Sequence, residues 1–200
     1  WIDKVKAFVK DMKGRLDEYH NLVSGNEIFL ARVKGIGAYD AETAIRYGLS
    51  GANLRCTGVK WDLRKNEPYC IYDRFDFDIP VGQNGDCYDR YYVRTEEIRQ
   101  SLRILEQALE QFPPEGETMG KVPRAIRPPA GEVYVRIESP RGEIGCYIVS
   151  KGKAEPYRLK FRRPSFVNLQ ILPKLLVGES MTNLVTILGG IDIVLGEVDC

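Results

Sequence analysis

The sequence predicts an α+β fold that is mainly helical, with long antiparallel helices and a small antiparallel β-meander. Three patterns support this prediction. Apolar residues recur at alternating spacings of three and four over residues 2–23 and again over 91–112, which is typical of long amphipathic helices packed on one another. Apolar and charged residues then alternate over 133–162, which is typical of strands with two unequal faces.

The first long helix is expected from Ile2 to about Val23, ending near Gly25. The chain begins at Trp1 without an initiator Met and enters a helical pattern at once. We therefore expect a piece of a longer protein, with no signal peptide. His20 is the only histidine, and its place next to the apolar stripe favours a helix-surface residue over a metal ligand.

A short helix is expected from Ala41 to Tyr47, where Asp40 is a suitable N-cap and Gly48 can end the helix. Regular periodicity is lost over 49–85, where aromatic residues are interleaved with aspartates. We expect a long aromatic and acidic loop there, because loops of this length are commonly functional or packed by partners. Aspartates between the rings would repel phosphates, which argues against nucleic acid as a partner.

The second long helix is expected from Asp86 to Phe112. Asp86 can cap it, Asp89 suits the positive end of the helix dipole, and Pro113 stops it. Polar side chains form a flank beside the apolar stripe: Arg90, Arg94, Glu97 and Ser101. This flank is either a solvated face with ordinary ion pairs or a charged row buried between subunits or lining a cavity. The spacing alone favours the solvated face.

The remainder of the chain is expected to begin with a linker over 113–130, which is rich in proline, glycine and charge. Three short strands follow within 131–162, and one side of them is basic through Arg136, Arg158, Lys160 and Arg162. Short helices are expected over 165–176 and 181–188. The tail 191–200 is apolar with three acids, so we expect it to be buried.

This pattern divides the chain into three parts. Residues 1–112 form a helical portion that includes the 49–85 loop, and residues 113–130 form the linker. Residues 131–200 form the β-meander with short helices and a buried C-terminal tail.

The composition excludes several classes of function. Apolar residues make up 44% of the chain and charged residues 28%, and the formal net charge of +1 offers no bulk field for nucleic acid. No apolar run is long enough to span a bilayer, so a membrane role would come through partners. Five cysteines without a C-x-x-C pair favour reduced thiols over disulfides or a zinc site. No nucleotide-binding glycine motif, catalytic triad or glycosidase carboxylate pair stands out.

A series of specific motifs nevertheless runs through the chain. They are GVKWDLRK (58–65), PY (68–69), FDIPVG (77–82), GDCYDR (85–90), RTEEIRQS (94–101), GEVY (131–134), PRGE (140–143), PYR (156–158) and PSFVNLQ (164–170). In this order they resemble the C-terminal half of the 49 kDa subunit family of respiratory complex I, the NADH:quinone oxidoreductase, which in bacteria is the D subunit.

The resemblance implies a fold like that of the nickel–iron hydrogenase large subunit, a helical bundle with peripheral strands. It implies a peripheral position on the cytoplasmic face of the bacterial inner membrane, or on the matrix side in mitochondria, with membrane contact only through partner subunits. With the neighbouring iron–sulfur subunit and other peripheral-arm subunits, the family forms a cavity where quinone takes electrons, coupled to proton translocation. The [4Fe-4S] cluster that supplies them belongs to the neighbour, so no cofactor is expected on this chain.

The chain departs from the family in two ways. The family's quinone headgroup ligands, a His and a Tyr, lie in the N-terminal half, so we expect this piece alone to be inactive. The family also ends in Arg, where this chain has Cys200.

The related hydrogenases end in D-P-C-x-x-C, whose two thiolates hold nickel. Asp192 matches the Asp, Val194 the first Cys and Glu197 the second. Valine cannot ligate a metal and one carboxylate cannot replace two thiolates, so a hydrogenase-type metalloenzyme is disfavoured. Instead we expect these residues to line or support the vacated metal cavity, with Arg141 as the partner of Glu197.

The candidate quinone-cavity residues are therefore Arg141, Asp192, Val194, Glu197 and Cys200. The candidate members of a buried charged row beside the cavity are Asp86, Arg90, Arg94 and Glu97. The alternative for each is structural: a turn residue, plain core, or ion pairs between subunits. For the whole chain, the alternative is a non-catalytic scaffold that docks the iron–sulfur subunit.

Overall fold

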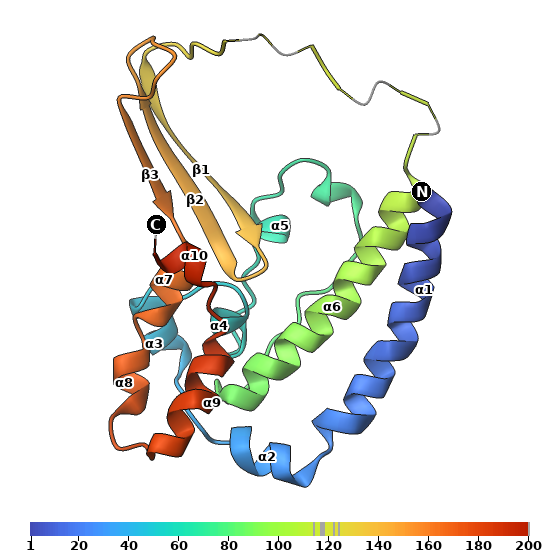
Figure 1. Cartoon of the computed structure of the whole chain (residues 1–200), viewed down its shortest axis with the longest axis vertical. Helices are drawn as coiled ribbons and strands as arrows, with labels where there is room; N and C mark the ends of the chain where they lie inside the picture. The colour runs from blue at the N-terminus through green and yellow to red at the C-terminus, as the bar shows by residue number, and fades with distance from the viewer. Residues whose placement is uncertain (114, 117–118, 122, 124, 200) are drawn as a thin grey trace.

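The computed structural model describes residues 1–113, 115–116, 119–121, 123 and 125–199. It combines helices with one small antiparallel sheet (Figure 1), which confirms the predicted α+β class. The relation to the nickel–iron hydrogenase fold and the division into three parts stay predictions. The helices are α1 Ile2–Tyr19, α2 Glu27–Val33, α3 Ala41–Arg46, α4 Ala52–Arg55, α5 Leu63–Asn66, α6 Cys87–Glu110, α7 Pro164–Leu169, α8 Leu172–Leu176, α9 Met181–Ile191 and α10 Leu195–Val198. The strands are β1 Gly131–Ser139, β2 Gly142–Ser150 and β3 Arg158–Arg162.

The two long helices α1 and α6 lie antiparallel along one side of the molecule (Figure 1). Asp86 caps α6 as predicted, because its side chain accepts a hydrogen bond from the backbone N–H of Asp89 (2.8 Å). Val9 and Leu16 of α1 pack with Leu102 of α6 in a small core of their own. The heptad-like spacing therefore identified the correct pair of helices.

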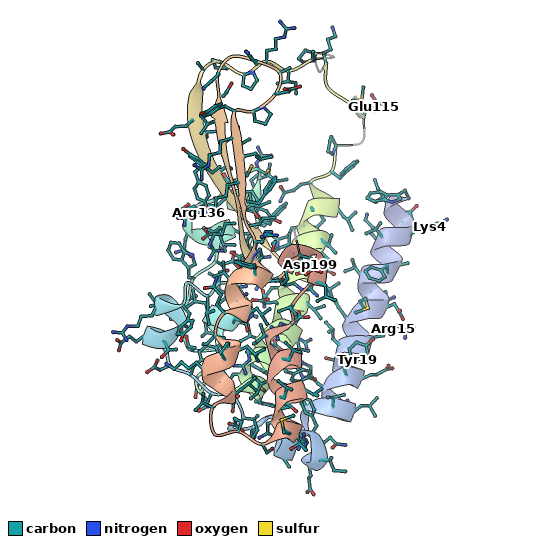
Figure 2. The ribbon with its side chains drawn as sticks, turned by 60° about the vertical axis from the view of Figure 1, so that its left-hand side comes forward. Lys4, Arg15, Tyr19, Glu115, Arg136 and Asp199 are labelled. Atoms are coloured by element: carbon teal, nitrogen blue, oxygen red, sulfur yellow. The ribbon has the colours of Figure 1, made fainter. Side chains whose placement is uncertain are left out.

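The apolar stripe of α6 is covered only in part. Ile98, Leu105 and Phe112 keep 42%, 38% and 52% of their surface exposed. The expectation that the stripe packs along its whole length is wrong at these positions, since one neighbouring helix covers only part of a stripe this wide. On the far side of α1, Lys4 and Arg15 project away from the rest of the molecule (Figure 2).

A π-helical turn, His20–Ser24, continues α1 and was not indicated by the sequence. His20 Nδ1 lies 2.9 Å from Ser24 Oγ, and Nε2 lies 3.2 Å from Glu96 Oε1 of α6. The histidine thus links the end of α1 to α6.

The main core lies where α2, α3, α4, α8 and α9 meet the start of α6. Its buried side chains are Val33, Tyr39, Ala44, Leu49, Leu54, Cys56, Cys87, Ile171, Leu175, Ile187 and Ile191. Within the described residues, no helix has both the length and the apolar character needed to cross a membrane.

Residues 49–85, predicted as an irregular loop, contain α4, α5 and a 3-10 turn, Tyr72–Arg74. Phe75 and Phe77 are buried, whereas the intervening Asp76 and the following Asp78 face outward and pair with Arg103 of α6. The alternation of aromatic and acidic residues therefore reflects a segment with one buried and one exposed side.

The predicted meander is confirmed, with the strand order β1-β2-β3. Val135 pairs with Cys146, which pairs with Phe161, so this face of the sheet is apolar. The opposite face carries the basic residues, as predicted, but three glutamates share it. Glu143, one of these, lies 3.2 Å from Arg136 and 3.5 Å from Arg162, so the basic character of this face is largely balanced.

The C-terminal tail is less buried than expected. Ile191 is buried, but Val194 and Leu195 keep 37% and 67% of their surface exposed. The prediction of a buried tail is wrong here, because α10 packs on α7 and still leaves Val194 and Leu195 in contact with solvent.

Candidate functional site

Asp192 ends α9 and lies between two arginines from distant parts of the chain. Arg94 of α6 places Nε 3.3 Å from Asp192 Oδ2, and Arg141 in the β1–β2 turn places Nη2 3.3 Å from Asp192 Oδ1. Asp192 has a left-handed backbone conformation with φ 58°, which few residues other than glycine, asparagine and aspartate adopt readily. The two ion pairs hold the residue there and determine how the tail leaves α9.

Close backbone contacts position the turn that carries Arg141. A Cβ atom on Gly51 would lie 2.7 Å from the Arg141 carbonyl oxygen, and one on Gly142 would lie 2.5 Å from Ser50 Oγ. Both positions therefore require glycine. Asn168 Nδ2 of α7 donates a hydrogen bond to the same Arg141 oxygen (3.0 Å). The segment before α4 and helix α7 thus hold the turn beside the end of α9.

Two buried amide side chains complete this arrangement, and neither was among the residues predicted from the sequence. Asn53 Nδ2 donates to the carbonyl oxygen of Ile191 (3.0 Å), which also accepts from Arg94 Nη2 (3.0 Å). Asn168 Oδ1 accepts from the backbone N–H of Ser50 (3.1 Å). The available signal was a polar amide inside an otherwise apolar segment, because such a residue needs partners when it is buried.

The charge around Asp192 is unevenly balanced. Arg94 and Arg141 share this one carboxylate, and Arg90 lies one turn before Arg94 on α6. Burial lowers the pKa of Arg94; Asp192 opposes this shift and Arg90 adds to it. A guanidinium stays protonated in spite of such a shift. The site therefore has surplus positive charge among the described residues, which suits an electron-rich oxygen.

Glu197 does not pair with Arg141, so this expectation is wrong. Glu197 Oε2 instead accepts from the backbone N–H and the hydroxyl of Ser165, at 3.0 and 2.5 Å, at the start of α7. Ser165 Oγ in turn accepts from the backbone N–H of Val194 (3.1 Å). The Arg141 guanidinium is already paired with Asp192, whereas the free N–H groups at the start of α7 attract the Glu197 carboxylate.

The flank of α6 is largely buried, so the solvated face that its spacing favoured is wrong for Arg90, Arg94 and Glu97. The four row candidates nevertheless do not form one row. Asp86 caps α6 and accepts from the backbone N–H of Gly35 (2.8 Å). Arg90 binds backbone carbonyls, Arg94 joins Asp192, and Glu97 joins a separate ion-pair cluster. Positions three or four apart on a helix still face different neighbours when several elements pack against it.

A cavity of about 610 Å³ lies between α2, α6 and α9, beside Asp192. Phe29, Ile98 and Val185 contribute apolar wall, and Arg94 and Asp192 contribute charged groups. Its volume is in the range of small-molecule sites, about 300–1,000 Å³. Of the predicted quinone-cavity residues, only Asp192 lines it.

The other candidates lie elsewhere. Arg141 reaches the cavity through its ion pair with Asp192, whereas Val194 and Glu197 contact Ser165 on the α7 side. Cys200 lies outside the described residues. Among the residues that the structure describes, no group of three or more His, Cys, Asp or Glu side chains is arranged to hold a metal ion.

Comparison with known proteins supports the resemblance seen in the motifs. Residues 1–128 and 120–200 match the family described as respiratory-chain NADH dehydrogenase, 49 kDa subunit. The D subunit of NADH-quinone oxidoreductase from Bacillus mycoides (strain KBAB4) is 71% identical over 199 residues, and the D subunits from Bacillus anthracis and Bacillus cytotoxicus are 72% identical. Each alignment covers 100% of this chain and 54% of the relative, so the chain spans about half the length of these relatives. The motifs, the family match and this identity together show that the chain belongs to the family of the 49 kDa subunit of respiratory-chain NADH dehydrogenase.

Proposed function

We propose that this chain forms part of the wall of a quinone-reduction site in an NADH-quinone oxidoreductase complex. In this proposal the site is shared with a neighbouring iron–sulfur subunit, whose [4Fe-4S] cluster supplies electrons, and the reaction is coupled to proton translocation. The chain takes a peripheral place on the cytoplasmic face of the membrane. The family and the name of its relatives support the complex.

The observation that carries the proposal is the position of Asp192. It lies beside an apolar cavity and is held by Arg94 and Arg141, which come from α6 and the sheet. An apolar pocket with a few convergent polar groups is the common form of a site for a small, largely apolar ligand. Guanidinium groups next to such a pocket favour negative charge on a ligand oxygen.

The chain's own residues would orient the ligand and shape its electrostatic surroundings. The apolar side chains of Phe29 and Val185 would contact the ring, and the ion pair with Asp192 would keep the Arg94 guanidinium in place. Val194 and Glu197 determine the path of the tail through their shared contact with Ser165. They would act on the site through backbone position rather than by direct contact.

The second candidate function is a scaffold that docks the iron–sulfur subunit and has no part in quinone chemistry. The apolar face of the sheet favours this alternative, because Val133, Val135 and Phe161 are each about half exposed, at 51%, 56% and 51%. An exposed apolar face of this kind commonly marks an interaction site.

The test uses the assembled complex with Asp192→Asn in this subunit. Loss of the carboxylate frees Arg94 and Arg141, so we expect the quinone reductase rate to fall roughly tenfold to a hundredfold with normal complex content. Arg141→Met should act in the same direction, and Glu197→Gln and Val194→Met should act less. Asp199→Asn, at the exposed end of the same tail (Figure 2), is the matched control.

The quinone-site proposal is wrong if Asp192→Asn and Arg141→Met assemble normally and leave the rate and the inhibitor response unchanged. Loss of complex content in parallel with the rate would instead support the scaffold.

A further inference from the structure

A second cluster of charged side chains lies around Arg55, the last residue of α4, which is 2% exposed. Arg55 Nε lies 2.6 Å from Glu97 Oε1 of α6. Arg55 Nη1 lies 2.8 Å from Glu138 Oε1 of β1 and 3.7 Å from Asp62 Oδ2 at the N-cap of α5. Arg64 completes the cluster, with Nη2 2.6 Å from Asp62 Oδ2. Side chains from α4, the start of α5, α6 and β1 thus meet at one guanidinium.

The cluster has more carboxylates than cations. Two guanidinium groups face three carboxylates, so the fully ionised cluster has a net charge of −1 in the interior. The titratable and charged groups that surround Glu138 are Arg55 of α4, Asp62 and Arg64 at α5, Tyr69 and Tyr72 of the following segment, Glu97 of α6, and, on the same face of the sheet, Glu143 of β2 with its partner Arg136. Burying an uncompensated charge is costly, and a carboxylate in this situation commonly takes up a proton.

The hydrogen bonds indicate which carboxylate takes the proton. Asp62 accepts from Arg64 through Nε (3.0 Å), Nη2 (2.6 Å) and the backbone N–H (2.9 Å), an arrangement that favours its ionised form. Glu97 accepts the hydrogen bond that Arg55 Nε donates and does not share this donor with Asp62 or Glu138. Glu138 shares Arg55 Nη1 with Asp62, and its other donor is the backbone N–H of Leu63 (3.2 Å). Its side chain is only 5% exposed, so Glu138 is the least compensated of the three.

A small cavity of about 200 Å³ gives access to the cluster. Arg55, Glu97, Glu138 and Ser139 line it, and its volume accommodates several water molecules. Ser139 Oγ is buried and has no hydrogen-bond partner among the described residues. A water molecule in this cavity would satisfy the hydroxyl and carry a proton to Glu138.

The cluster is also close to the Asp192 site. Glu97 follows Arg94 by one turn of α6, and Arg94 is paired with Asp192. Glu97 and Arg94 therefore connect the two sites along one helix. We propose that Glu138, with Arg55, Asp62 and Glu97, forms an internal proton-binding site that is electrostatically coupled to Asp192 through Glu97 and Arg94.

The role of this proton in quinone reduction rests on the proposed function. A quinone that accepts two electrons also takes up two protons to become a quinol. Glu138 would hold one of these protons, and water in the 200 Å³ cavity would restore it. The binding of the proton by Glu138 does not depend on that use, so the two can be tested separately.

The first experiment measures the infrared band of a protonated buried carboxyl group in the 200-residue chain, across a pH titration. We expect the band to persist above the pH at which an ordinary Glu, with a pKa of about 4.3, is already ionised. Glu138→Gln should abolish it. Glu143→Gln is the matched control, because Glu143 is the cross-strand partner of Glu138 but has two guanidinium neighbours of its own. The band should survive in this control.

Two further variants test the charge balance and the coupling. Glu97→Gln removes the surplus carboxylate, so the midpoint of the band should move to lower pH even if Glu138→Gln fails to fold. Asp192→Asn removes a negative charge next to Arg94 and should also lower the midpoint. A missing band, or a band that is unchanged in Glu138→Gln, overturns the proton site. A midpoint unmoved by Asp192→Asn overturns the coupling.

The last measurement is the pH profile of quinone reduction by the complex. Glu138→Gln should lower the rate most at high pH, where proton supply limits it, and Glu143→Gln should not. If Glu138 carries the band but the profile is unchanged, the proton site stands and its role in quinone reduction is wrong. The proposed function itself stands or falls with Asp192→Asn and Arg141→Met.

Discussion

The molecule contains two fully buried arginines with opposite surroundings. Arg55 is 2% exposed and has three carboxylates within ion-pair distance. Arg90 is 0% exposed and, among the described residues, has none. Instead Arg90 donates to the carbonyl oxygens of Gly85 (2.9 Å) and Gly37 (3.0 Å) and to Cys87 Sγ (3.0 Å), with its guanidinium 5.1 Å from the Tyr39 ring centroid.

The neighbours of Arg90 remain neutral near physiological pH. Burial raises the pKa of Tyr39 and of the Cys56 and Cys87 thiols. The carbonyl dipoles and the aromatic ring therefore stabilise a fixed cation. Around Arg55, by contrast, burial would lower the arginine pKa, but Glu97, Glu138 and Asp62 raise it above its usual value. The difference is that Arg90 is held by groups that stay neutral near physiological pH, whereas Arg55 is held by carboxylates.

The largest expected effect is that of Arg55→Leu at pH 8. It leaves three carboxylates with one guanidinium, which should lower the free energy of unfolding by roughly 3–5 kcal/mol. At pH 5 the loss should be smaller, because the carboxylates can take up protons. Urea unfolding at both pH values measures this difference. Equal losses of unfolding free energy at the two pH values would show that the ionisation of the three carboxylates does not depend on Arg55.

Arg90→Leu should cost about 3 kcal/mol, because the Gly37 carbonyl oxygen loses its Arg90 donor and the Gly85 oxygen keeps only the backbone N–H of Tyr39. This loss should be the same at pH 5 and pH 8, since none of the partners titrates in that range. A loss that shrinks in acid would contradict the comparison. Arg158→Leu, on the exposed face of β3, is the control for both arginines and should stay within about 0.5 kcal/mol of the wild type.

Glu138→Gln should change the pH dependence of stability. Burial raises the pKa of Glu138, and Arg55 opposes the shift without cancelling it. The folded chain therefore holds this proton more tightly than the unfolded chain. The free energy of unfolding then falls as the pH rises from the ordinary Glu pKa of about 4.3 through the raised value. In Glu138→Gln that fall should be absent.

Urea unfolding from pH 4 to pH 8 measures the slope, with Glu143→Gln as the control that keeps it. Asp62 should act in the opposite sense: burial favours its neutral form, but Arg64 and Arg55 outweigh this and lower its pKa. Its contribution to stability is therefore lost as the pH falls through that lowered value. A Glu138→Gln slope identical to that of the wild type would show that Glu138 is ionised throughout.

The smallest expected effect compares two adjacent glycines of α9 and tests how rigidly Arg90 is held. A Cβ atom on Gly190 would lie 3.1 Å from Cys87 Sγ and 3.3 Å from Arg90 Nε, whereas one on Gly189 would meet nothing within 4 Å. Gly189→Ala should stabilise the chain by up to about 1 kcal/mol through helix propensity. Gly190→Ala should show no such gain in thermal unfolding. Equal gains in both variants would mean that Arg90 moves easily.

Much of the fold was predictable from local patterns. The alternating spacing located α1 and α6. Asp86 marked the start of α6, and Asp40 marked the start of the short helix α3. The alternation over 133–162 marked the sheet. Each of these signals depends on residues a few positions apart, where backbone geometry determines which side chains are neighbours. The family was likewise evident from contiguous motifs.

The candidate site was predictable only in part. Asp192, Arg94 and Arg141 were each singled out, but their pairing was not predicted, because Arg94 and Arg141 lie 98 and 51 positions away from Asp192 in the chain. Arg55 went unnoticed inside a segment without periodicity. Its role as the centre of a cluster depends on Glu97 and Glu138, which lie 42 and 83 positions further on.

The sequence by itself thus determined the two long helices, the sheet, the caps and the family. Only the tertiary structure decided which of two similar arginines on neighbouring helices is surrounded by carboxylates and which by carbonyl groups. The physical reason is that the spacing along α6 establishes which residues share a face, but the charge opposite that face comes from elements placed there by packing. Glu97 and Arg94 are one turn apart, yet one meets Arg55 and the other meets Asp192.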